Sequence, residues 1–137
     1  MALPTVGGGY QFNDGNLSEV KMSVAPAPAT ATDTATLTAD QLLNGIIIGT
    51  PTATAIYTLP LATAIDSTLS NSKVGTTFEF RVITAAAYGI TIATNTGWTI
   101  GSSGTQGLMT IAATAGTVRS FRARKSADGA WALYAIS

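Results

Sequence analysis

Short stretches of alternating apolar and polar residues run through most of the chain after residue 33. The clearest is residues 76–84, where Phe78, Phe80 and Val82 alternate with polar or charged side chains. Such alternation is typical of a strand with one buried face, and this one is long and apolar enough to be central. We therefore expect residues 76–84 to lie in the middle of a sheet.

Shorter patterns of the same kind predict seven more strands, separated by turns rich in glycine, asparagine and aspartate. They are residues 34–38, 46–48, 52–59, 90–93, 108–113, 117–125 and 130–136. The three isoleucines of 46–48 predict a buried strand, and in 52–59 we expect Ala55, Tyr57 and Leu59 to share one face.

Three glycine-containing segments divide the second half of the chain. The Asp128-Gly129 pair predicts a tight hairpin between 117–125 and 130–136, and residues 114–116 predict another between 108–113 and 117–125. Residues 97–107, which include Trp98 and Ile100, are expected to form a loop.

Two short helices interrupt the strands in the first half. Thr38 and Gln41 have the spacing of a capping box, and Gly45 provides a helix stop. Pro60 suits the first turn of a second helix, in which Leu61, Ile65 and Leu69 recur at fourfold spacing.

Residues 1–33 differ from the rest of the chain. They contain a glycine run, an Asn-Asp-Gly-Asn turn signal and an Ala/Pro/Thr segment that proline keeps extended. We expect an extended N-terminal arm and linker over 1–33, followed by one domain over 34–137. Tyr10, Phe12 and Leu17 flank the turn. A small hairpin is marginally stable alone, so we expect these residues to become ordered only in contact with a partner.

Together these elements predict an all-β fold. We expect a jelly-roll-like sandwich or barrel of about eight short strands, with one or two short helices and the N-terminal arm. The many threonines suit a pleated surface because β-branched side chains pack well on it.

Composition narrows the function. Only 10% of the 137 residues are charged, against roughly 25% in a typical globular protein, so much of the surface is expected to face other protein. The formal net charge of zero argues against nucleic acid or an anionic membrane as partner. No stretch approaches 18 apolar residues, so no membrane-spanning segment is expected.

Catalytic groups are scarce. The chain has no Cys and no His, which removes the thiolate nucleophile, the commonest general base and the usual metal ligands. Ser70 and Lys73 match the S-x-x-K spacing of serine β-lactamases, but the companion motifs are absent. The carboxylates suit turns, a helix start and a strand pair. We expect no enzyme, no cofactor and no metal site.

One predicted strand carries most of the basic residues: Arg119, Arg122, Arg124 and Lys125. Arg122 and Arg124 share a face. The strand has three interpretations: a solvated or edge-protecting strand, an ionic contact with a partner protein, or a nucleic-acid contact, against which the lack of interleaved aromatic residues argues. We take Arg122 and Arg124, with Tyr10, Phe12 and Leu17, as candidate partner contacts.

Residues 34–137 resemble a known family. The motifs are L-T-A-D-Q-L-L-N-G at 37–45, Y-T-L-P-L-A-T-A at 57–64, V-G-T-T-F-E-F at 74–80, and the closing hairpin over 117–134. They are similar to those of capsid decoration, or cement, proteins of tailed bacteriophages.

The resemblance implies a β-rich virion subunit, usually a homotrimer, on the outer capsid surface. It would bind the major capsid protein and resist expansion of the shell. Similar modules occur in phage tails and fibres, so a tail or fibre module that binds a receptor or carbohydrate is the alternative. Trp98 and Tyr88 are its only evident loop aromatics.

Overall fold

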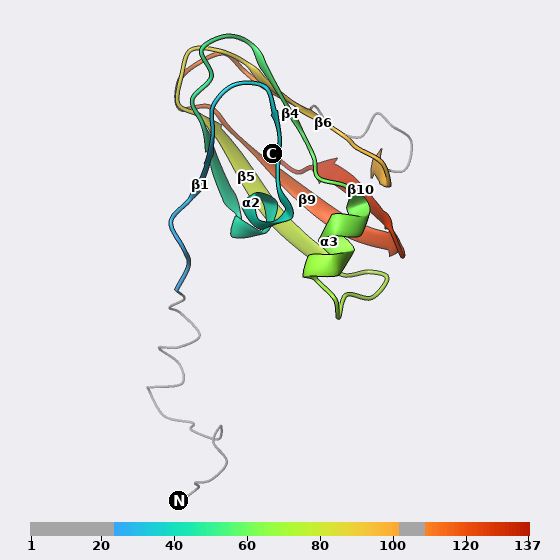
Figure 1. The fold of residues 1–137 in the computed structure, drawn as a ribbon. Coiled ribbons are helices and arrows are strands. Elements are labelled where there is room, and N and C mark those ends of the chain that lie inside the picture. Colours follow the sequence, from blue (N-terminus) through green and yellow to red (C-terminus); the bar gives the residue numbers. More distant parts are fainter. Residues whose placement is uncertain (1–23, 102–108) are drawn as a thin grey trace, which may run out of the picture.

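The computed structural model describes residues 24–101 and 109–137, which form two β-sheets packed face to face with two short helices at one end (Figure 1). The six-stranded sheet has the order β1 (Ala29–Ala31), β3 (Ile46–Gly49), β5 (Thr77–Thr84), β9 (Val118–Ala127), β10 (Ala130–Ala135) and β7 (Trp98–Ile100). The four-stranded sheet has the order β2 (Ala35–Thr36), β4 (Ala55–Thr58), β6 (Ile90–Ala93) and β8 (Thr110–Ile111).

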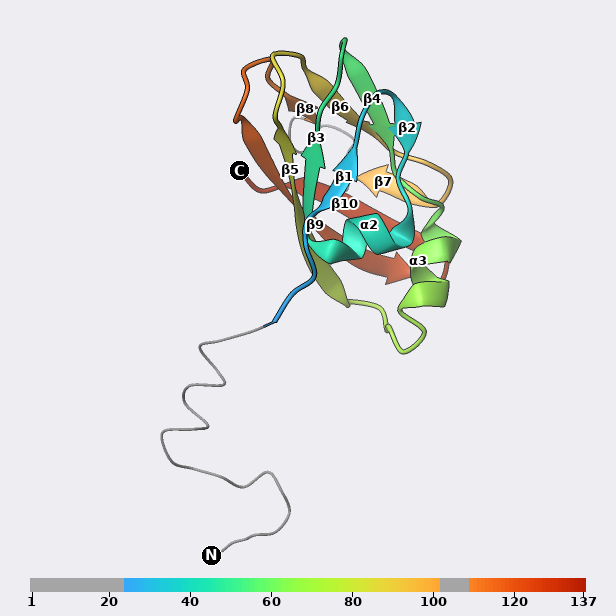
Figure 2. The ribbon, with the colours of Figure 1, turned by 60° about the vertical axis from the view of Figure 1, so that its left-hand side comes forward.

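The chain winds between the two sheets from β1 to β6. Each odd strand of this segment lies in the six-stranded sheet and each even strand in the four-stranded sheet. Successive strands in the same sheet are parallel: β3 pairs with β1 and β5, and β4 pairs with β2 and β6. The helices lie at one end, and the β1–β2, β3–β4 and β5–β6 loops lie at the other (Figure 2). We call residues 29–93 the wound segment.

This topology confirms a β-rich fold but does not confirm a jelly roll. A jelly roll is built from antiparallel strands, whereas both sheets here mix parallel and antiparallel pairs. The antiparallel pairs come from the C-terminal part, where β9 pairs with β5 and β10, and β8 pairs with β6.

Two local predictions in this C-terminal part were wrong. Trp98–Ile100 is a strand, β7, which pairs in parallel with β10, although the sequence predicted a loop there. Residues 114–116 do not close a hairpin: they carry the chain from β8 in one sheet to β9 in the other. The Asp128-Gly129 hairpin between β9 and β10 is confirmed.

Both helices form where the sequence predicted them. In α2 (Ala39–Asn44) the Thr38 side chain accepts from the Gln41 N–H, Gln41 accepts in return from the Thr38 N–H, and Gly45 ends the helix with φ of 96°. The second helix, α3 (Ala62–Thr68), buries Ile65 but leaves Leu61 exposed just before its first turn.

The core between the sheets is dominated by aromatic side chains. Tyr57, Phe80, Phe121 and Trp131 are fully buried, and the rings of Phe80 and Phe121 stack at 5.2 Å between centroids. Ala55, Tyr57 and Leu59 share one face, as predicted, and the structure shows that this face is the buried one. The central place of β5 is also confirmed. Of the isoleucines in 46–48, only Ile47 is fully buried.

Buried polar contacts join successive turns of the wound segment. The Tyr57 hydroxyl lies in the core and donates to the carbonyl of Thr32 at 2.8 Å, one turn earlier. This requires glycine at position 49, because a Cβ there would lie 2.6 Å from the Tyr57 hydroxyl oxygen. Just after β6, the half-buried Asn95 side chain donates to the Leu59 carbonyl at 3.1 Å.

The six-stranded sheet begins inside the segment that the sequence assigned to the linker. Ala29–Ala31 pair with β3, so residues 29–31 belong to the sandwich. Two side chains of α2 hold this stretch: the Gln41 amide donates to the Thr30 carbonyl at 2.9 Å, and the Asn44 amide donates to the Ala27 carbonyl at 2.8 Å. The helix thereby covers an edge strand that would otherwise be open.

Candidate functional site

The outer face of the six-stranded sheet is the strongest candidate for a functional surface. Alternation along β5 and β9 buries one set of side chains against the other sheet and exposes the other set. The exposed set is mostly polar. We call this outward-pointing set the arginine face. It consists of Thr77, Glu79 and Arg81 on β5, Arg122 and Arg124 on β9, and the half-buried Tyr134 on β10.

The strand register places these residues beside one another. Glu79 lies opposite Arg122, and Arg122 lies in turn opposite Tyr134. Arg124 lies opposite Thr77. The prediction that Arg122 and Arg124 share an exposed face is confirmed.

A hollow of about 600 Å³ opens on this face. Its lining is formed by Thr77, Arg122, Arg124, Tyr134, Ala135 and Ile136. A guanidinium group can hold a carboxylate with two parallel hydrogen bonds, and the aromatic ring and Ile136 offer apolar contact beside it. The hollow is therefore suited to an acidic side chain or another carboxylate-bearing group.

The charges on this face do not balance. Glu79 accepts from Nε and Nη2 of Arg122, with Nε to Oε2 at 3.0 Å, and its other oxygen lies 3.9 Å from Nη2 of Arg81. No ion pair among the described residues includes Arg124. One carboxylate thus faces three guanidinium groups, although the whole chain is neutral.

Arg119 and Lys125, the other two basic residues of β9, do not belong to the arginine face. Arg119 reaches across to the neighbouring sheet, where Nε donates to the Thr110 carbonyl at 2.9 Å, and Nη1 donates to the Ser137 carbonyl. Strand β9 itself lies between β5 and β10, so the suggestion that it forms a charged sheet edge was wrong. Arg119 instead covers the edge of β8.

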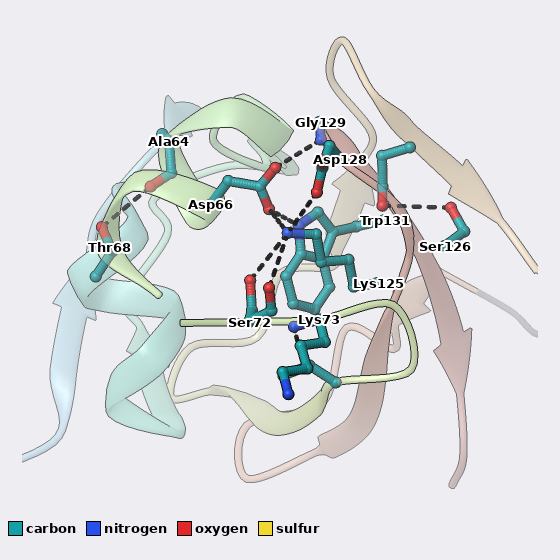
Figure 3. Close-up of polar contacts among 12 residues, drawn as sticks. Ala64, Asp66, Thr68, Ser72, Lys73, Lys125, Ser126, Asp128, Gly129 and Trp131 are labelled. Carbon is teal, nitrogen blue, oxygen red and sulfur yellow. Dashed lines mark hydrogen bonds and ion pairs between the residues drawn. The ribbon is translucent and has the colours of Figure 1, made fainter. Parts of the chain in front are cut away.

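Lys125 is buried at the helical end of the molecule, and Figure 3 shows its surroundings. Its ammonium group lies 3.2 Å from Oδ1 of Asp66 on α3 and 3.2 Å from Oδ1 of Asp128 in the hairpin turn. It also donates toward the hydroxyl and the carbonyl of Ser72. The three N–H groups therefore have partners, as a buried lysine requires.

Asp66 receives two further hydrogen bonds, from the backbone N–H of Gly129 at 2.6 Å and from the indole N–H of Trp131 at 2.9 Å (Figure 3). Desolvation pushes the pKa of Asp66 upward, but these hydrogen bonds and Lys125 together hold it below the ordinary value. Desolvation likewise opposes the charge on Lys125, yet Asp128 and Asp66 raise its pKa overall.

The contacts of Lys125 and Asp66 with each other and with the hairpin indicate a structural ion cluster. A nucleophilic lysine requires a lowered pKa and a general acid requires a raised one, and the cluster shows the reverse of both. Its physical effect is to tie α3 and the following loop to the β9–β10 hairpin. The alternation of sides along a strand predicts that Lys125 and Arg124 lie on opposite faces of β9. Nothing in the sequence near residue 125 indicates that Asp66 is the partner of Lys125.

The S-x-x-K pair lies on the surface. Ser70 and Lys73 are exposed in the turn after α3, where the backbone N–H of Lys73 donates to the Thr76 hydroxyl. Within 24–101 and 109–137, no group of three or more His, Cys, Asp or Glu side chains is placed to hold a metal ion. None of the helices in those ranges is long and apolar enough to cross a membrane.

The other predicted contact residues have different outcomes. Tyr10, Phe12 and Leu17 lie outside the described residues, so their role stays a prediction. Trp98 is buried and its indole N–H donates to the Pro60 carbonyl at 2.7 Å, which removes it as a sugar platform. Tyr88 is exposed. Sequence reasoning missed Arg81 and Tyr134, which a correct strand register would have added to Arg122 and Arg124.

Comparison with known proteins adds no relative: the chain matches no family model, no curated protein and no solved structure.

Proposed function

We propose that the protein is a structural component of a tailed-bacteriophage virion: a homotrimeric decoration protein that binds the major capsid protein on the outer capsid surface. The observation that carries the proposal is the arginine face, an exposed, unbalanced group of three arginines around a hollow. The motif resemblance over residues 34–137 supplies the partner.

The arginine face is well placed for a lasting protein contact. It lies on β5, β9 and β10, and the register of β5 with β9 runs without interruption from Thr77 to Ile83. Side chains on a continuous sheet are already positioned before binding, so less conformational entropy is lost on association. A protein that holds neighbouring capsid subunits together needs this kind of rigid contact.

The chemistry of the face indicates what the partner offers. Glu79 already compensates Arg122, which leaves Arg124 and much of the charge of Arg81 for an outside group. Carboxylates are the matching groups because each can accept two hydrogen bonds from one guanidinium. We infer that the capsid protein presents aspartate or glutamate side chains to the hollow beside Arg124.

The direct test is co-sedimentation of the full chain with capsids of the phage that carries its gene, prepared without this protein. We expect the wild-type chain to bind, and Arg124→Glu to weaken binding about tenfold to a hundredfold through loss of charge-assisted hydrogen bonds. Lys73→Glu is the matched control, because it reverses one exposed base that does not belong to the arginine face. It should bind within about twofold of wild type.

Two results would contradict the proposal: no binding of the wild-type chain to capsids, or equal binding by Arg124→Glu and wild type. Immunogold labelling of whole virions separates the alternative, since a tail or fibre module would place the label away from the head. A glycan-binding module would also lose its ligand with Tyr88→Ala.

A further inference from the structure

Among the six residues of the arginine face, Glu79 alone is acidic. It lies directly opposite Arg122 on the neighbouring strand and two residues before Arg81 on its own strand. Arg124 lies diagonal to it, two residues from Arg122 along β9. Diagonal neighbours on one face of an antiparallel pair are roughly 7 to 8 Å apart, within reach of long side chains. The Glu79 carboxylate therefore lies near every arginine of this face.

The carboxylate makes its closest contact with Arg122. Nε and Nη2 of Arg122 both donate to Oε2, with Nε at 3.0 Å, while Oε1 lies 3.9 Å from Nη2 of Arg81. The Glu79 side chain is 36% exposed, against 50% for Arg122 and 51% for Arg81. Because a partly covered charge is screened less than an open one, an anion that approaches these two guanidinium groups also meets the charge of Glu79.

Two classes of anion place different demands on this face. A single carboxylate needs one guanidinium group, and Arg124, which makes no ion pair among the described residues, can supply both hydrogen bonds. Nucleic acid presents a row of phosphates, and its affinity for a protein comes from neutralising several of them at once. Because Glu79 compensates Arg122 and lies beside Arg81, it repels a second or third phosphate on this face.

We propose that Glu79 sets the anion specificity of the arginine face: it allows an isolated carboxylate to bind at Arg124 and excludes the phosphate backbone of nucleic acid. Without this carboxylate, three guanidinium groups on one sheet would form a basic patch of the kind that binds phosphates without sequence preference. Specificity often depends on such a repulsive element. The inference rests on the proposed function for the accepted carboxylate and deepens it, because it names the anion that the same surface rejects.

The test is binding of the full chain to a fluorescently labelled DNA duplex of about 20 base pairs, followed by fluorescence anisotropy at about 50 mM sodium chloride. We expect no saturable binding by wild type. Glu79→Gln should bind at least about tenfold more tightly than the wild-type limit, and salt should weaken that binding. Asp40→Asn is the matched control, because it removes one exposed carboxylate on α2 and changes the net charge equally. It should behave as wild type.

Glu79→Thr is a second uncharged variant, since threonine suits an exposed strand position. Glu79→Asp keeps the charge and should stay with wild type. Circular dichroism shows which variants fold, and either folded uncharged variant decides the outcome.

Three results would overturn the inference. They are wild-type binding as tight as that of Glu79→Gln, folded uncharged variants that bind DNA no better than Asp40→Asn, and an equal gain by Glu79→Asp. Because no capsid is used, the DNA result and the capsid-binding result can fail separately.

Discussion

Gly97 and Gly116 have the same backbone conformation, with φ of 91° at both, but different surroundings. A Cβ at position 97 would lie 2.5 Å from the Ala62 Cβ and 2.5 Å from the Gly129 carbonyl oxygen, while a Cβ at 116 would meet nothing within 4 Å. Both positions favour glycine, but only at Gly97 do neighbouring atoms already occupy the space that a Cβ would need.

We therefore expect Gly116→Ala to lower the free energy of unfolding by about 1 to 2 kcal/mol, the cost of a left-handed conformation. Gly97→Ala should cost that amount plus about 1 to 3 kcal/mol for overlap with fixed backbone. Urea denaturation of both variants measures the difference. Equal losses would mean that the backbone near Gly129 can move away.

The ion cluster makes a pH-dependent prediction. Because the pKa of Asp66 is lowered in the folded protein, its carboxylate stabilises the fold above the ordinary carboxyl pKa of about 4, and this stability is lost as the pH falls further. Because the pKa of Lys125 is raised, its contribution is lost only when the pH rises above about 10.

Asp66→Asn should therefore lower the Tm most between those limits, and its difference from wild type should narrow in acid. Asp128→Asn is the graded control: Asp128 is 99% exposed, so its effect should be smaller. Thermal unfolding over a pH series measures both. A difference that stays constant from neutral pH into acid would show that the Asp66 charge is not what stabilises the cluster.

For single residues, the sequence indicates on which side of a strand a side chain lies, but not which residue it contacts. Period-two alternation correctly puts Arg122 and Arg124 on the exposed side of β9 and Lys125 on the other. It cannot show that Lys125 meets Asp66, because that contact depends on how the wound segment brings α3 to the hairpin. The arginine face was therefore half predictable, and the ion cluster was not.

Among the secondary-structure elements, α2 depends on Gln41 for two structural roles: capping its own N-terminus and holding β1. Gln41 completes the capping box with its side-chain oxygen and holds β1 with its side-chain N–H. Glutamate can keep the first contact, since it also serves in a capping box, but it cannot donate to the Thr30 carbonyl.

We expect Gln41→Glu to leave α2 intact and to speed amide hydrogen exchange in Ala29–Ala31, with a loss of about 0.5 to 1.5 kcal/mol for the missing bond. Gln41→Ala should loosen both elements. Exchange measured by mass spectrometry resolves the two segments. If Gln41→Glu leaves exchange at 29–31 unchanged, the parallel pairing with β3 is sufficient to hold β1.

The elements that the sequence predicted well have local signals. A capping box and a glycine stop define α2, and Asp-Gly defines the β9–β10 hairpin. Strand β7 was missed because it is three residues long and depends on pairing with β10, far along the chain. Residues 114–116 show that a turn signal gives a change of direction without saying whether the flanking strands pair.

At the scale of the whole molecule, the two sheets differ in charge, and salt should distinguish contacts made through them. An ionic contact through the arginine face weakens as ionic strength rises, because the Debye length falls from about 10 Å at 0.1 M to about 3 Å at 1 M. The strands of the four-stranded sheet contain no charged residue, so a contact through their outer face has no charge to screen.

We expect capsid co-sedimentation of the full chain to weaken on going from about 0.1 M to about 1 M sodium chloride, while the solution mass stays the same. Both are measured on one preparation. Loss of the oligomer in salt would assign the contact between copies to charged residues, and salt-resistant capsid binding would remove the ionic role of Arg124.

Local sequence patterns could not predict the order and direction of the strands in the two sheets. The sequence indicated short strands, two helices and a two-sided core, all of which depend on periodicity over a few residues. Parallel winding joins Ile46 to Arg81 and Ala55 to Ile90, and no strict repeat in the sequence marks those registers. An antiparallel jelly roll satisfies the same burial pattern, so the pattern could not choose between them.

The position of β1 also determines how the molecule bears force. Residues 24–28 leave the sandwich roughly in line with β1 (Figure 2), and they come before its parallel pairing with β3. A pull along that line loads the hydrogen bonds of β1 in shear, all at once, together with those from Gln41 and Asn44. A subunit tethered through its N-terminal segment would therefore resist tension better than one whose edge strand is peeled away bond by bond.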